Sequence, residues 1–272
     1  MKLHIGSGDR RIAGFLNVDV RPGPNTDVVG HAGDLSQVRD ASVDTLFAHA
    51  LFEHVYVGHQ LPVLREWRRV MVPGGLIVCL GLPNFRAICE LYLAGAPGIV
   101  SPRFDLFEVY RYTHGDPEHA APKAWPAWSP SEHRDAAPSG WIPQLHKGLF
   151  DPTQLADLLA RAGLDATVFA YTYPGERHRL NLGFVSQSGS GPAATRLGDD
   201  EVVRLVARVP DADRYVQTGS VRSMPAAAGA ADGLAAYADQ LDTRHPHEPT
   251  PTVAPSLAAR VRRKFGRLVG GS

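Results

Sequence analysis

The sequence is poor in cysteine and has no excess of charge of either sign. Only Cys79 and Cys89 occur among 272 residues, too few for a disulfide framework or a cluster of metal-binding thiolates. A reducing, cytoplasmic environment is therefore expected. The 28 basic and 28 acidic side chains give a formal net charge of zero, so no overall field attracts nucleic acid or an anionic membrane. A specific small-molecule site is favoured instead.

Long hydrophobic runs are also missing. No stretch approaches the roughly 20 apolar residues that a membrane-spanning helix needs. The segment from Met1 to Gly6 runs directly into an apolar strand pattern and lacks the zones of a secretory signal. A hydrophobic fraction of 44% and a charged fraction of 21% are typical of a globular protein. We expect a soluble protein that is not exported.

The first half of the chain instead alternates between strand and helix patterns. Apolar residues recur at intervals of three and four from Gln60 to Met71, which predicts an amphipathic helix stopped by Pro73, Gly74 and Gly75. The following run, LIVCLGL, has no polar alternation, as expected of a central parallel strand. Shorter apolar segments predict earlier strands within residues 2–8, 15–20, 26–30 and 42–50. This alternation predicts a parallel α/β sheet.

Residues 84–146 differ from this pattern because they are rich in proline, histidine and tryptophan. They predict an insert that covers the sheet and binds an acceptor. Regularity returns with a helix that begins at Asp151 and Pro152 and ends near Gly163. Two strand-like runs, 164–173 and 180–188, then predict a closing antiparallel hairpin.

Past Ser188 the composition shifts to alanine, proline and glycine. Such a segment has few large aliphatic side chains to bury. We therefore expect one domain over residues 1–188 and a loosely packed or disordered tail over 189–272. Short helices are expected within this tail near 199–208 and 255–268.

A glycine turn follows the first predicted strand, and an acid ends the second. In HIGSGDRRIAGFLNVDV, Gly6 and Gly8 let the backbone approach a ligand closely, and Asp19 can accept hydrogen bonds from ribose hydroxyls. A dinucleotide fingerprint would need a third glycine and about twenty residues before the acid, whereas Asp19 follows Gly8 by eleven positions. A tight turn beside a solvated aspartate is an alternative.

An ordered series of motifs resembles the class I methyltransferases that use S-adenosylmethionine (SAM), especially a bacterial group of predicted methyltransferases associated with saccharide modification. The motifs are HIGSG, GFLNVDV, GDL, SVDTLFAHALFEHV, LREWRRVMVPGGLIVCLGLPN and HKGLFDPTQLADLLARAGL. The resemblance spans about residues 1–188 and implies a Rossmann-like sheet with a terminal antiparallel hairpin. It assigns SAM contacts to Gly6, Ser7 and Gly8 at the amino-acid end, Asp19 at the ribose, Asp34 and Leu35 beside the adenine, and His49 near the methionine portion.

Methyl transfer to a sugar hydroxyl needs a base because the hydroxyl has a high pKa, and histidine is the commonest choice. We expect His146 to be this base. It stands where the insert ends and the regular pattern resumes, just before the helix that begins at Asp151. A packing role beneath that loop is the alternative.

The acceptor site is expected to combine aromatic faces with polar edges. The candidates are Glu53, His54, Tyr110, Tyr112, His114 and Trp141. The aromatic members could equally form the insert's own small core. His49, His54 and His59 are five positions apart, which does not align them on one helical face. A weak Mg²⁺ site with Glu53 or Asp116 is the remaining metal hypothesis.

These patterns predict a SAM-dependent O-methyltransferase that acts on a hydroxyl of a sugar, an oligosaccharide or a glycosylated metabolite. The expected partner is that acceptor, without nucleic acid or stable membrane insertion. One alternative is an NAD-linked sugar oxidoreductase on a similar fold. Another is a catalytically silent SAM-binding scaffold that uses its tail for partners. The acceptor, the methylated position and the oligomeric state do not follow from the sequence.

Overall fold

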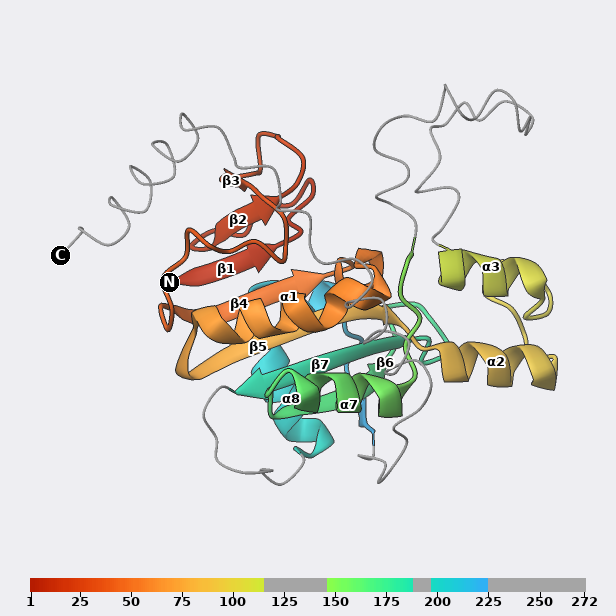
Figure 1. Ribbon diagram of the computed structural model, residues 1–272. Helices are drawn as coiled ribbons and strands as arrows, with labels where there is room; N and C mark the ends of the chain where they lie inside the picture. The colour runs from red at the N-terminus through yellow and green to blue at the C-terminus, as the bar shows by residue number, and fades with distance from the viewer. Residues whose placement is uncertain (115–145, 188–196, 225–272) are drawn as a thin grey trace.

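The computed structural model describes residues 1–114, 146–187 and 197–224. Within these ranges, eight strands form one sheet in the order β3-β2-β1-β4-β5-β7-β6-β8 (Figure 1). The strands are β1 (Lys2–Ile5), β2 (Leu16–Asp19), β3 (Val28–Val29), β4 (Val43–His49), β5 (Met71–Pro83), β6 (Ala166–Tyr171), β7 (Asn181–Gln187) and β8 (Arg222–Ser223). The helices are α1 (Val57–Val70), α2 (Phe85–Ala94), α3 (Leu106–His114), α7 (Pro152–Arg161) and α8 (Asp199–Val206), with short 3-10 turns at Phe52–His54 and Ala212–Arg214.

The sheet is parallel over its first five strands and antiparallel at the other end. β1 pairs in parallel with both β2 and β4, and β4 pairs in parallel with β5. β7 runs antiparallel to β5 and to β6. The predicted parallel α/β sheet with a closing antiparallel hairpin is therefore confirmed.

Strand β5 is buried on both faces, as its uninterrupted apolar run predicts. Ile77 and Cys79 share one core cluster with Trp67 of α1 and Leu155 of α7. Leu76, Val78 and Leu80 belong to a second cluster, which contains Val202, Leu205 and Val206 of α8. Because successive residues of a strand point to opposite faces, α1 and α7 cover one face of the sheet and α8 covers the other.

Part of the region expected to be a loose tail belongs to this core. The segment from Leu197 to Met224 contains α8 and β8, and β8 pairs with β6. Val202, Leu205 and Val206 recur at the spacing of a helical face and are buried against the sheet. A short helix near 199–208 was predicted and corresponds to α8, whereas its burial against the sheet was not expected from the average composition of residues 189–272. The helix expected at 255–268 lies outside the described residues.

The insert begins with two helices beyond the end of β5. Figure 1 shows α2 and α3 side by side, projecting away from the sheet. Ile88, Phe104 and Leu180 form a small core beneath them. The rest of the insert, including Asp116 and Trp141, lies outside the described residues.

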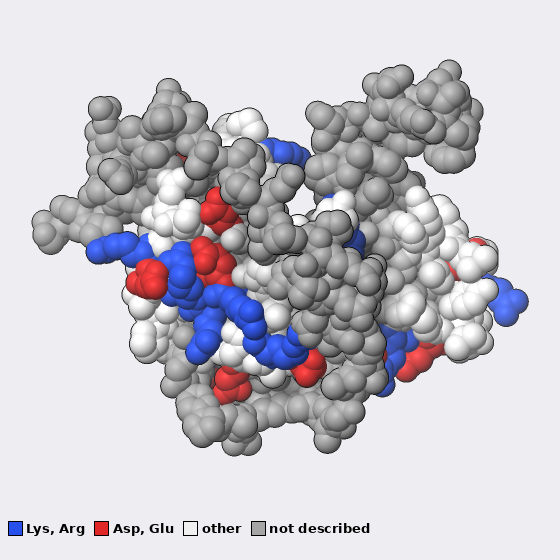
Figure 2. All heavy atoms as spheres, viewed as in Figure 1, with Lys and Arg blue, Asp and Glu red and all other residues white. Residues whose placement is uncertain are grey.

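None of the helices in the described ranges has the length and apolarity to cross a bilayer. On the face shown in Figure 2, basic and acidic side chains lie side by side over the described part of the molecule. This distribution agrees with the formal net charge of zero.

The packing of α1 generates a stability prediction. Trp67 is fully buried, its ring lies 5.7 Å from that of Phe52, and its Nε1 donates to the carbonyl of Ala32 at 2.9 Å. Trp67→Ala should lower the free energy of unfolding by about 3–5 kcal/mol, because the change leaves a cavity and an unpaired carbonyl. Denaturant unfolding followed by circular dichroism measures this loss. Arg65→Ala on the exposed face of the same helix is the control, expected within about 0.5 kcal/mol of the unchanged protein.

Candidate functional site

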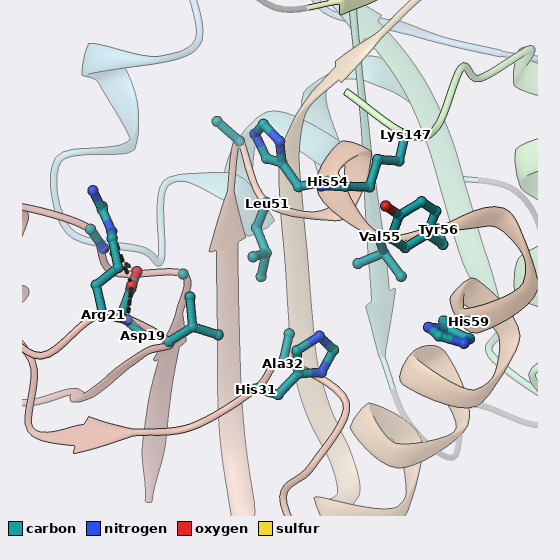
Figure 3. Close-up of a pocket in the computed structure, with 14 residues that line it drawn as sticks. Asp19, Arg21, His31, Ala32, Leu51, His54, Val55, Tyr56, His59 and Lys147 are labelled. Carbon is teal, nitrogen blue, oxygen red and sulfur yellow. Dashed lines mark hydrogen bonds and ion pairs between the residues drawn. The ribbon is translucent and has the colours of Figure 1, made fainter. Parts of the chain in front are cut away.

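A cavity of about 480 Å³ lies at the carboxyl ends of β1, β2 and β4. Ligands bind at this edge in open α/β sheets, because the loops that follow the parallel strands meet there. Figure 3 shows Asp19 and Arg21 on one side of the cavity and His54, Tyr56 and Lys147 on the other. The lining residues are Gly6, Gly8, Asp19, Val20, Arg21, His31, Ala32, Ala50, Leu51, His54, Val55, Tyr56, His59 and Lys147.

The glycine turn after β1 forms one wall of the cavity. Gly6 and Gly8 have φ angles of +71° and +52°, a region that residues with a side chain rarely adopt. A Cβ atom on Gly6 would lie 2.9 Å from the side chain of Leu51, so a larger residue would clash as well. The Gly6 and Ser7 amides both donate to the carbonyl of Val18, at 2.8 and 3.1 Å. The turn is thus fixed against β2.

Asp19 ends β2, and backbone donors hold both of its carboxylate oxygens. Oδ2 accepts from the Gly8 amide at 2.7 Å, and Oδ1 accepts from the Arg21 amide at 2.8 Å. The Arg21 side chain adds an ion pair at 3.4 Å. Because each carboxylate oxygen has two lone pairs, Asp19 can still accept a hydrogen bond from a ligand in the cavity.

The opposite wall carries imidazoles, an aromatic ring and an ammonium group. His31 follows β3, and burial lowers its pKa, with repulsion from His59 adding to the effect. Tyr56 precedes α1, and the Nζ atom of Lys147 lies 5.3 Å from the centre of its ring. Burial also lowers the pKa of Lys147. This wall therefore offers hydrogen-bond donors and an aromatic surface.

Three titratable residues, Glu53, His54 and His146, meet beside this wall; we call them the Glu53 cluster. Each offers one ligand atom, and these atoms lie within 4.8 Å of one another. The rings of His54 and His146 are 5.1 Å apart, and Nε2 of His54 lies 3.7 Å from Oε1 of Glu53. His54 also lines the cavity, so the cluster and the cavity adjoin.

Burial dominates the chemistry of the Glu53 cluster. Glu53 is only 1% exposed, its Oε2 has no hydrogen-bond partner among the described residues, and burial raises its pKa to about 8. Burial also lowers the pKa of His146, whose Nδ1 lies 3.0 Å from the carbonyl of Tyr112. A carbonyl can only accept, so Nδ1 carries the proton and Nε2 keeps its lone pair.

Backbone hydrogen bonds bring the distant parts of the cluster together. The amides of Lys147 and Gly148 donate to the carbonyl of Glu53 at 2.7 and 2.9 Å. The segment that follows the insert is thereby attached to the turn that follows β4. Lys147 consequently lines the cavity, whereas His146 stands beside the lining residue His54 and does not itself line the cavity.

The other residues expected at the cofactor lie near the cavity without lining it. Ser7 is buried between the two lining glycines. The side chain of Asp34 accepts from Ser36, and Leu35 is buried in the core. His49 is bonded to the hydroxyl of Tyr173 at 2.8 Å and stacks on Tyr215. Burial, with a smaller effect of Arg10, lowers the pKa of His49 to about 3.

The aromatic candidates on α3 lie apart from the cavity lining. The Tyr112 hydroxyl donates to Glu176 at 3.1 Å, which attaches α3 to the loop between β6 and β7. Tyr110 is 45% exposed, and its ring stacks 4.7 Å from that of His114. Tyr112 thus has a structural contact, whereas Tyr110 and His114 present a flat aromatic surface.

Several lining residues were not predicted from the sequence. They are Val20, Arg21, His31, Ala32, Ala50, Leu51, Val55, Tyr56, His59 and Lys147. Most of them lie within a few positions of the carboxyl end of a predicted strand, and that position was the available signal. Lys147 follows the predicted base directly.

A family model described as "Methyltransferase domain" matches residues 13–79. No curated protein matches the chain. Similar solved structures include SAM-dependent methyltransferases from Thermotoga maritima (13% identity, TM-score 0.39, 69% of this chain and 81% of that chain covered) and Methanosarcina mazei (15%, 0.40, 69% and 91%). A SAM-dependent methyltransferase from Archaeoglobus fulgidus is similar to the same degree (12%, 0.40, 69% and 85%).

The family match covers much of the cavity lining but not the glycine turn of Gly6 and Gly8 or the segment with Lys147. Residues 13–79 run from the loop before β2, through Asp19 and the turn after β4, into β5. The sheet order supplies the fold independently of the distant structural likenesses. The strand order confirms the predicted mostly parallel sheet with an antiparallel end. Over residues 13–79, which include Asp19 and Glu53, the chain is similar to a methyltransferase domain, in agreement with the prediction.

Proposed function

We propose that this chain transfers a methyl group from SAM to a hydroxyl of a saccharide or glycosylated metabolite, with His146 as the base. One observation carries the proposal. The cavity has the glycine turn and Asp19 on one side, and on the other side it adjoins the Glu53 cluster through His54. A cofactor site and a proton acceptor are therefore neighbours.

The cavity fits an adenosyl cofactor in size and chemistry. A volume of about 480 Å³ lies within the roughly 300–1,000 Å³ typical of small-molecule sites. The glycine turn supplies backbone that a ligand can approach closely, and Asp19 supplies a fixed acceptor for ribose hydroxyls. Among the residues after β3, His31 and Ala32 border the cavity, whereas Asp34 and Leu35 do not. We therefore assign the adenine wall to the first pair.

The chain's own groups must align the acceptor and remove its proton. SAM would supply a methyl group bound to a positively charged sulfonium, whose sulfur leaves readily as the neutral thioether of S-adenosylhomocysteine. Because burial keeps His146 neutral and Tyr112 holds its Nδ1 proton, Nε2 can accept the hydroxyl proton as the new bond to oxygen forms. His54 lies between the cavity and His146, where it can help to orient the hydroxyl.

A saccharide acceptor is supported by exposed aromatic rings near this edge. Tyr56 is 57% exposed beside the cavity, and Lys147 lies over its ring. The stacked pair of Tyr110 and His114 offers a second flat surface on α3. Sugar rings pack on such surfaces through their apolar faces while their hydroxyls bind polar edges. The methyltransferase match does not favour the oxidoreductase alternative.

The cofactor assignment predicts that Asp19→Ala weakens SAM binding by about 10- to 100-fold, because the cavity loses a charged acceptor and the glycine turn loses its attachment. Isothermal titration calorimetry with SAM and S-adenosylhomocysteine measures the change. Asp9→Ala is the matched control, since Asp9 is an exposed acid in the same loop outside the cavity. Tight binding of NAD with no response to either adenosyl compound would contradict the assignment.

The base assignment predicts that His146→Ala lowers the methyl-transfer rate by about 10²-fold or more while SAM affinity stays unchanged. Transfer of labelled methyl to a panel of sugars and glycosylated metabolites measures the rate. His178→Ala, in a loop outside the cavity, should leave the rate unaltered. Full activity of the His146 variant would end this role for His146. Adenosyl binding by the unchanged protein with no transfer to any acceptor would instead favour a silent scaffold.

A further inference from the structure

The Glu53 cluster contains a buried oxygen whose hydrogen-bonding capacity is unused. Glu53 is 1% exposed, and its Oε2 has no partner among the described residues. A buried carboxyl oxygen without a partner is costly in either protonation state. The cost is removed when a cation binds the oxygen, and two imidazoles stand beside it.

The donor set of the cluster is that of a transition-metal site. Two imidazole nitrogens and one carboxylate oxygen lie within 4.8 Å of one another. Donors around a tetrahedral Zn²⁺ at about 2.0–2.1 Å stand roughly 3.4 Å apart, a separation close to the 3.7 Å between Nε2 of His54 and Oε1 of Glu53. Modest side-chain rotations would complete the site. Mg²⁺ suits it poorly, since that ion prefers oxygen ligands.

His146 is already oriented in the way that metal-binding histidines are. A ligating imidazole usually donates its second N–H to a carbonyl or carboxylate, which fixes the ring and the tautomer. Nδ1 of His146 makes this contact with the carbonyl of Tyr112 at 3.0 Å. Nε2 is then the nitrogen available to a metal ion.

We propose that Glu53, His54 and His146 bind one divalent transition-metal ion, such as Zn²⁺, with a coordination position open toward the cavity. Three protein ligands with an open position are the arrangement of catalytic rather than structural zinc sites. The open position follows from His54, which belongs both to the cluster and to the cavity wall.

This metal site is separate from the proposed function, but a bound metal ion would occupy the nitrogen atom that the proposed base uses. A lone pair on Nε2 of His146 can bind either a proton or a metal ion. If His146 is the base, the ion and the acceptor proton compete for one atom. Zn²⁺ is therefore expected to slow methyl transfer, and a chelator is expected to restore it.

Metal binding is tested without any substrate. The full chain, purified with a chelator and dialysed, is titrated with ZnCl₂ and MgCl₂ by calorimetry and with CoCl₂ by visible absorption. We expect one Zn²⁺ per chain, little heat from Mg²⁺, and cobalt bands typical of nitrogen and oxygen ligands. Glu53→Gln and His146→Ala should each weaken Zn²⁺ binding at least about 10-fold, since even the outer partners of a metal ligand contribute that much.

The matched control is His59→Ala, because His59 lines the cavity but is not part of the cluster. Its Zn²⁺ affinity should equal that of the unchanged protein. Circular dichroism checks that each variant is folded. If the variant at the buried residue Glu53 does not fold, His146→Ala still tests the site. Absence of Zn²⁺ binding to the full chain, or equal binding by the folded variants, overturns the proposal.

Activity separates the metal site from the proposed function. Slower methyl transfer at the Zn²⁺ concentrations that saturate the calorimetric signal supports both. Faster transfer supports the metal site and overturns His146 as the base. Absence of any methyl transfer by the metal-free chain, together with normal Zn²⁺ binding in calorimetry, supports the metal site and overturns the proposed function alone.

Discussion

The hydrogen bond from the Gly8 amide to Asp19 is the constraint on which the cavity depends. It fixes a turn in left-handed geometry against the end of the neighbouring strand, and the Val18 carbonyl holds the same turn from behind. The short parallel strands β1 and β2 are thus locked at the edge where ligands bind. The acid that can hold a cofactor's ribose is also the acid that shapes the loop around it. Binding and local structure therefore share one carboxylate.

Much of the fold could be predicted because its signals are local. The apolar run of β5, the helical spacing in α1, and the turn between β6 and β7 each lie within a few residues of chain. The packing of α8 was less evident. The apolar face of α8 is short and lies within a segment rich in small residues. The sequence does not indicate that this face packs on Phe47 and Val78 of the sheet; the structure shows that contact. Composition averaged over a long segment cannot reveal such a contact.

The candidate site also has a part that local sequence predicts and a part that depends on long-range contacts. Gly6, Gly8 and Asp19 lie in one continuous motif, so the sequence alone indicated their shared role. Glu53, His54 and His146 were each candidate site residues in the sequence, but the sequence did not predict that they lie together. Their proximity depends on long-range hydrogen bonds from the amides of Lys147 and Gly148 to the carbonyl of Glu53. Nothing in the spacing of these residues encodes that contact. His49 illustrates the converse: its motif position suggested the cofactor, whereas Tyr173 and Tyr215 engage its ring elsewhere.

The chain segment between α3 and His146 begins and ends at neighbouring points of the fold. The His146 amide donates to the carbonyl of His114 at 3.3 Å, so the chain leaves α3 and returns at the same point of the fold. An excursion with coincident ends can lengthen, shorten or be exchanged at small entropic cost. Related proteins could therefore differ in the length and sequence of this segment while the cavity at the carboxyl edge of the sheet stays the same, because other parts of the chain build most of it.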